Sequence, residues 1–83
     1  QIGFRIGEMK SLINIATLYL EQHNYSEALE YLRQSLALRS DNDPHTYGIA
    51  LSNIARAYRG AGNLVQALQR GLEGLQVLDN LGD

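Results

Sequence analysis

Residues 12–19 read LINIATLY, and residues 51–58 read LSNIARAY. Leu12 of the first stretch corresponds to Leu51 of the second, and at the same offset nine positions are identical between residues 12–38 and residues 51–77. Self-similarity with a fixed period of about 20–50 residues is typical of proteins built from stacked repeats. The sequence therefore predicts two copies of one structural unit.

Apolar residues recur every three or four positions in four segments, which predicts amphipathic helices at about residues 5–22, 25–39, 44–59 and 64–80. Each segment has one apolar stripe, and the stripes of the first three segments are expected to face the core. The predicted stripes hold Leu12, Ile15, Ala16 and Tyr19 in the first segment; Ala28, Leu29, Tyr31, Leu32 and Leu36 in the second; Tyr47, Ala50, Leu51, Ile54, Ala55 and Tyr58 in the third; and Ala67, Leu68, Gly71, Leu72, Leu75 and Leu78 in the fourth.

Residues that begin and end helices lie between these segments. Asn24 and Asn63 are predicted N-caps, and Glu27 follows Asn24 at the spacing of a capping box. Asp43 is a third predicted cap, and Pro44 suits the first helical position because its missing N–H would be unpaired there. The glycines of residues 60–62 are expected to end the third helix.

The ends of the chain share one phase of the repeat. A positive φ is tolerated at Gly3, Asn42 and Gly82, and successive members of this set lie one repeat length apart. Gly3 is expected to form a lead-in before the first helix. The predicted fold is all-α: an α-solenoid of two tandem helix–turn–helix hairpins. Residues 1–83 are expected to form one domain, with repeats at about 3–41 and 42–81, as a piece of a longer array.

The composition and net charge of the chain limit the classes of function that it can have. The chain has 83 residues and a net charge of −2, with six Arg and one Lys against nine acidic residues. This balance predicts no basic surface for nucleic acid, and no apolar run has the length of a membrane span. The chain contains no cysteine, which excludes disulfides and fits a reducing, cytoplasmic setting.

No residue pattern in the chain predicts an enzyme or a cofactor site. Gly60 and Gly62 begin a phosphate-loop pattern, but the lysine of that pattern is absent, so a turn between helices is favoured. Asp41, Asp43 and His45 are close in sequence, but the glycine and the distant glutamate of a calcium loop are missing. We therefore expect no catalysis, metal or cofactor.

Two sets of residues, one in each copy, resemble the tetratricopeptide repeat family. The first is Leu12, Ile15, Ala16, Tyr19 and Ala28, and the second is Leu51, Ile54, Ala55, Tyr58, Gly62 and Ala67. The chain departs from the family pattern where Leu12 and Leu51 replace a Trp, where His23 replaces the turn glycine, and in its period, which is longer than the usual length of about 34 residues. The longer period is similar to a subclass found in kinesin light chains and large bacterial regulators. The resemblance implies binding of peptides or partner proteins, and it does not favour the carboxylate clamp of chaperone-tail binders.

Polar residues lie opposite the apolar stripes of the first and third helices. The resemblance implies that this face lines a concave, peptide-binding groove, which is expected to contain Lys10, Asn14, Thr17, Asn53, Arg56 and Arg59. The resemblance implies that Asn14 and Asn53 bond to a peptide backbone, which suits an amide because it both donates and accepts. The three basic residues favour an acidic ligand. The alternative is that these residues are solvated and have no partner.

The last helix carries a second candidate surface. Leu72, Leu75 and Leu78 are expected to face a neighbour, with Gly71 and Gly74 permitting close approach of another backbone, either from a further repeat or from another chain. The alternative for the glycines is a weak last repeat. These five residues predict self-association through the last helix. The leading function is a protein-interaction scaffold, and the alternative is a self-assembly module that stacks on its own copies and spaces other domains.

Overall fold

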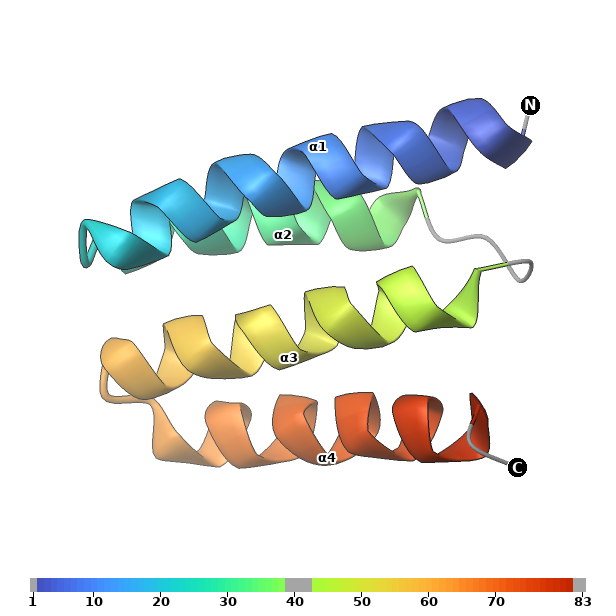
Figure 1. Ribbon diagram of the computed structural model, residues 1–83. Helices are drawn as coiled ribbons and strands as arrows, with labels where there is room; N and C mark the ends of the chain where they lie inside the picture. The colour runs from blue at the N-terminus through green and yellow to red at the C-terminus, as the bar shows by residue number, and fades with distance from the viewer. Residues whose placement is uncertain (1, 39–42, 82–83) are drawn as a thin grey trace.

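The computed structural model describes residues 2–38 and 43–81, without the side chains of residues 2–5 and 81. It contains α1 (Ile2–Glu21), α2 (Tyr25–Ala37), α3 (Pro44–Gly60) and α4 (Leu64–Leu81). Figure 1 shows that consecutive helices run in opposite directions and form two hairpins, α1 with α2 and α3 with α4. The predicted all-α arrangement of two helical hairpins is confirmed.

The third helix joins the two hairpins. α3 packs against α1 and α2 on one side and against α4 on the other, whereas α4 packs against α3 alone among the described elements. In Figure 1, α4 accordingly forms the outer edge of the arrangement. None of the helices in the described ranges combines the length and the apolar character needed to span a bilayer.

The two hairpin turns have the same backbone geometry. His23 and Gly62 both have a positive φ, 60° and 87° respectively. The amide of Asn24 donates to the carbonyl of Tyr19, and the amide of Asn63 donates to the carbonyl of Tyr58, each at 2.8 Å. This is the pattern of a helix end closed by a residue in the left-handed region.

Two of the three predicted caps, Asp43 and Asn63, bond to their helices through their side chains. The carboxylate of Asp43 accepts from the amide of Thr46 at 3.2 Å and from its hydroxyl, and the Asn63 side chain accepts from the amide of Gln66 at 3.3 Å. Asn24 also stands at the predicted N-cap position of α2, but its side chain makes no cap hydrogen bond, and its backbone carbonyl accepts from the amide of Ala28. Gly3 was wrongly predicted as a lead-in, since α1 already begins at Ile2. The predicted turns at Asn42 and Gly82 lie outside the described residues.

The core lies where α1, α2 and α3 meet. Its buried members are Ile13, Ala16, Leu20, Ala28, Leu32, Ala50, Ile54 and Ala57. Tyr19 of α1 stacks on Tyr31 of α2 at the edge of this cluster, with ring centroids 5.5 Å apart and an interplanar angle of 11°. The neighbouring Tyr31 raises the pKa of Tyr19 above its ordinary value.

The predicted inward stripe was partly wrong for α1. This helix buries Met9, Ile13, Ala16 and Leu20, while Ile15 remains 38% exposed. The physical reason is that α1 packs only against α2 and α3, and Ile15 lies on a side that neither covers. The equivalent residue in α3 is Ile54, which is only 3% exposed because the first hairpin covers it.

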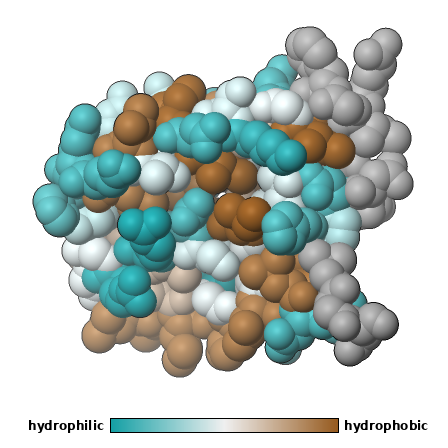
Figure 2. Space-filling model, in the orientation of Figure 1, coloured by the Kyte–Doolittle hydropathy of each residue, from teal (hydrophilic) through white to brown (hydrophobic). Residues whose placement is uncertain are grey.

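The same explanation applies to α4. Leu68, Leu72 and Leu75, which belong to the apolar stripe of α4, are 65%, 53% and 56% exposed. Because α4 packs against α3 alone, only one side of its apolar surface is buried. Figure 2 shows the consequence as a hydrophobic band along the edge that α4 forms.

Candidate functional site

The seam between α1 and α3 carries a first hollow where the middle of α1 lies beside the start of α3. Its volume is about 300 Å³. We call it the first seam hollow, and its lining consists of Lys10, Ile13, Asn14, His45, Thr46 and Ile49. Ile13 is buried and Ile49 is partly exposed, so an apolar surface lies between polar side chains.

A second hollow lies at the other end of the same seam. This second seam hollow has a volume of about 240 Å³ and is lined by Leu20, His23, Tyr25, Arg56, Arg59 and Gly60. His23 Nδ1 and the Tyr25 hydroxyl are 2.9 Å apart, which joins the hairpin turn to the start of α2. A Cβ atom on Gly60 would lie 2.3 Å from the Tyr25 ring, so the glycine makes room for this aromatic wall.

The structure distributes the predicted peptide-binding residues along the seam. Lys10 and Asn14 line the first seam hollow, and Arg56 and Arg59 line the second. Asn53 is half-buried on α3, between Ile49 and Arg56, which line one hollow each. The hydroxyl of Thr17 donates to the carbonyl of Ile13 at 2.9 Å and is therefore engaged within α1.

Sequence reasoning missed the aromatic part of the second seam hollow. The predicted groove residues all lie on the first helix of each hairpin, whereas His23 belongs to a turn and Tyr25 to α2. The available signal was the turn position of His23, because a closed hairpin turn brings its side chains back beside the end of α1.

The two hollows differ in their electrostatics. The pKa of Asp43 lies below its ordinary value, chiefly because its carboxylate accepts a hydrogen bond from Thr46, with smaller contributions from the nearby charges of Lys10 and His45. The positive charge at the first seam hollow is thus partly balanced. Within the described part of the chain, Arg56 and Arg59 have no carboxylate partner. The second seam hollow is therefore the more cationic of the two.

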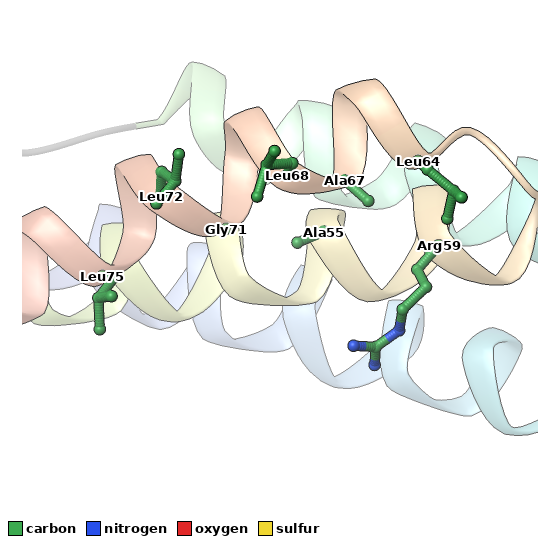
Figure 3. Close-up of a pocket in the computed structure, with 8 residues that line it drawn as sticks. All are labelled: Ala55, Arg59, Leu64, Ala67, Leu68, Gly71, Leu72 and Leu75. Atoms are coloured by element: carbon green, nitrogen blue, oxygen red, sulfur yellow. The ribbon is translucent and has the colours of Figure 1, made fainter.

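An apolar groove lies away from the seam, along α4. It has a volume of about 370 Å³. We call it the α4 groove; it is lined by Leu64, Ala67, Leu68, Gly71, Leu72 and Leu75 of α4 and by Ala55 and Arg59 of α3. Figure 3 shows the four leucines along α4, while the guanidinium group of Arg59 is directed away from them. Arg59 lines both this groove and the second seam hollow.

The residues predicted for self-association fall into two groups. Gly71, Leu72 and Leu75 line the α4 groove. Gly74 is buried against α3, where an added Cβ would lie 3.2 Å from the carbonyl oxygen of Gly48. Leu78 packs over Gly48 of the same hairpin. The close backbone approach expected at Gly74 thus occurs inside the chain.

Neither seam hollow is built for metal binding. The described residues contain no group of three His, Asp or Glu side chains that could hold a metal ion. Of the sequence cluster considered above, Asp43 accepts hydrogen bonds from Thr46, and Asp41 lies outside the described residues.

Comparison with known proteins places the chain in a family. The model of the family described as tetratricopeptide repeat matches residues 7–80. No curated protein and no solved structure matches the chain.

Proposed function

This chain belongs to the tetratricopeptide repeat family, and we propose that it binds an extended peptide segment of a partner protein along the seam between α1 and α3. Repeats of this family are generally protein–protein interaction modules and are generally non-catalytic. The long period, which carries Leu12 onto Leu51, supports a place near the lengthened repeats of kinesin light chains and large bacterial regulators.

The observation that carries the proposal is the second seam hollow with its two arginines. Arg56 and Arg59 have no carboxylate partner among the residues described, and an aromatic wall stands beside them. A guanidinium group holds a carboxylate through two parallel hydrogen bonds. The hollow therefore suits an acidic side chain of the ligand whose aliphatic part contacts Tyr25.

The asparagines suit the backbone of the same ligand. Asn14 lines the first seam hollow, and Asn53 lies on α3 between the two hollows. An amide side chain can donate to a peptide carbonyl and accept from a peptide N–H. Contacts of this kind position a chain of any sequence, whereas the arginines select acidic residues.

Fluorescence anisotropy with two matched peptide pools tests the proposal. The first pool holds short, capped, labelled peptides with Asp and Glu at randomised positions, and the second has Asn and Gln at those positions. We expect the acidic pool to bind about tenfold or more tightly, because hydrogen bonds to charged groups contribute about 1.5–3 kcal/mol. Equal binding of both pools, or of neither, would overturn the proposal.

Variants locate the site within the seam. Arg56→Gln should remove most of the preference for the acidic pool, and Asn53→Ala should weaken binding by about threefold to tenfold, the value of one hydrogen bond. Arg70→Gln is the matched control, because Arg70 lies on α4 and pairs with Glu73 at 3.0 Å. Asn53→Ala with unchanged binding, or with lost helicity, would exclude Asn53 from the site.

A further inference from the structure

We propose that the α4 groove binds α1 of a second copy of this chain, so that copies stack head to tail. Stacking through the α4 groove is distinct from peptide binding at the seam, because the groove shares only Arg59 with the second seam hollow. The contact that we propose between two copies already occurs within one chain, where the second hairpin packs on the first through α3.

The α4 groove has a covered counterpart within the same chain. In the alignment of the two repeats, the groove residues Ala55, Ala67 and Gly71 correspond to Ala16, Ala28 and Leu32 of the first hairpin. These three counterparts are completely buried in the core. The element that packs on them from the second hairpin is α3. The second hairpin therefore presents a surface that, in the first hairpin, is occupied by a helix.

The free face of α1 matches the helix that occupies the counterpart. The α3 residues in this contact are Ala50, Ile54 and Ala57, all of them buried. Their equivalents in α1 are Ser11, Ile15 and Leu18. Ser11 is exposed, and Ile15 and Leu18 are 38% and 60% exposed. Thus α1 carries the same kind of face as α3, with the same isoleucine at its centre, and leaves it uncovered.

The sizes of the side chains change in opposite directions on the two surfaces. In the groove, Gly71 stands where the first hairpin has the fully buried Leu32. On the incoming face, Leu18 stands where α3 has Ala57. The groove loses four side-chain carbon atoms and the incoming face gains three, so the summed volume of the contact is nearly preserved. Volume-conserving exchanges of this kind are the ones that packed interfaces tolerate best.

The charges also agree with a second copy as the occupant. In the alignment of the two repeats, Arg59 of the second hairpin is equivalent to Leu20 of the first. Within the chain, Leu20 lies near Arg56 and Gly60 of α3, because all three line the second seam hollow. The α1 residues equivalent to Arg56 and Gly60 are Thr17 and Glu21. Stacking in the same geometry brings Glu21 of the second copy beside Arg59 of the first, and neither is ion-paired within the described chain.

This contact joins two different surfaces and does not close on itself. After one contact forms, the pair still has one free α4 groove and one free α1 face. Contacts between unlike surfaces build rings or open chains of copies. We therefore expect assembly to continue past the dimer as concentration rises.

Sedimentation velocity of the 83-residue chain from micromolar to millimolar concentration tests the proposal. The wild-type average mass should rise with concentration beyond that of a dimer. Leu68→Glu, which blocks the groove, and Leu18→Glu, which blocks the α1 face, should each be monomeric. An equimolar mixture of the two variants should form a heterodimer and nothing larger, since one intact groove and one intact α1 face remain.

Matched variants complete the experiment. Val65→Glu should assemble like the wild type, because Val65 is exposed on α4 but does not line the groove. Arg59→Glu and Glu21→Arg should each weaken assembly, and the double variant should recover it. If circular dichroism shows that Leu68→Glu has lost helicity, Leu72→Glu takes its place. A monomeric wild type, a Leu18→Glu variant that assembles normally, or a mixture that stays monomeric would each overturn the proposal.

Discussion

His23 and Gly62 take the same left-handed backbone conformation, with φ of 60° and 87°, at equivalent positions of the two repeats. The hairpin turn therefore requires this conformation whichever residue occupies it. Left-handed φ costs an L-residue about 1–2 kcal/mol. At His23, the contact between its ring and the hydroxyl of Tyr25 compensates part of that cost.

The first prediction isolates the cost of this φ. Gly62 and Gly7 both have open space where a Cβ atom would lie, but Gly7 lies inside α1. Gly62→Ala should lower the free energy of unfolding by about 1 kcal/mol. Gly7→Ala should raise it by about 0.5–1 kcal/mol, because alanine is the better helix former. Urea denaturation measures both, and effects of the same sign would contradict the explanation.

The second prediction concerns two glycines of α4. An added Cβ at Gly74 would lie 3.1 Å from the Ser52 hydroxyl oxygen and 3.2 Å from a backbone carbonyl oxygen, whereas at Gly71 its nearest neighbour lies at 3.7 Å. Gly74→Ala should therefore destabilise the chain by about 1–3 kcal/mol through overpacking. Gly71→Ala should be neutral or stabilising by up to about 1 kcal/mol. If Gly74→Ala unfolds at the wild-type urea concentration, α3 and α4 do not approach as described.

The third prediction compares equivalent alanines in the two hairpins. Ala28 is completely buried, while Ala67 is only partly covered and lines the α4 groove. Ala28→Leu should cost about 1–3 kcal/mol, since the surrounding core has no room for three more carbon atoms. Ala67→Leu should cost clearly less. Thermal unfolding at a concentration where the chain is monomeric measures the difference, which would vanish if the two sites were equally packed.

The fourth prediction concerns the cap of α3. Asp43→Ala should lower the free energy of unfolding by about 1 kcal/mol at neutral pH, the typical value of an N-cap. Asp79→Ala is the control, because Asp79 is exposed within α4. The hydrogen bond from Thr46 holds the pKa of Asp43 below its ordinary value. The carboxylate therefore contributes stability above the ordinary aspartate pKa and loses it as pH falls through the lower, folded-state pKa.

The pH dependence supplies the check on that prediction. The difference in unfolding free energy between wild type and Asp43→Ala should shrink as pH falls. The reason is that a protonated Asp43 side chain has lost the negative charge that strengthens its two hydrogen bonds with Thr46. A difference that stayed constant down to strongly acidic pH would show that the charge of Asp43 does not stabilise α3.

The fifth prediction separates charge from shape in peptide binding. Added salt should weaken binding of the acidic pool, since exposed charges are screened over about 8–10 Å at moderate ionic strength. Arg56→Gln should bind more weakly and show a smaller salt dependence. Arg56→Lys should keep the salt dependence but lose affinity, because an ammonium group cannot form the paired hydrogen bonds of a guanidinium group. Titrations at two salt concentrations measure both quantities.

The sequence predicted the repeat, the helices and the caps at Asp43 and Asn63, because those features depend on residues close together in the chain. It did not predict the buried face of α1. Residues 12–20 are apolar on several sides of the helix, so spacing alone does not select Ile13 over Ile15. That choice is made by the helices that pack against α1.

The candidate site was predictable to a similar extent. The angular position of Lys10, Asn14 and Arg56 on their helices identified the seam. The wall that His23 and Tyr25 form depends on how the α1–α2 turn closes, which a helical wheel does not represent. Likewise, the space above Gly74 is filled by Ser52 and by the backbone of α3, which only the packed hairpin reveals.

The attachment of α4 through α3 alone has a consequence for native-state hydrogen exchange. Separating α4 from the molecule breaks one helix–helix contact and leaves the three-helix core intact. Elements held by few buried contacts open locally, at a smaller free energy than global unfolding. Amide protons of α4 should therefore exchange with solvent before those of the buried parts of α1 and α3. Their protection factors serve as a local gauge, which rises when any molecule covers the outer side of α4.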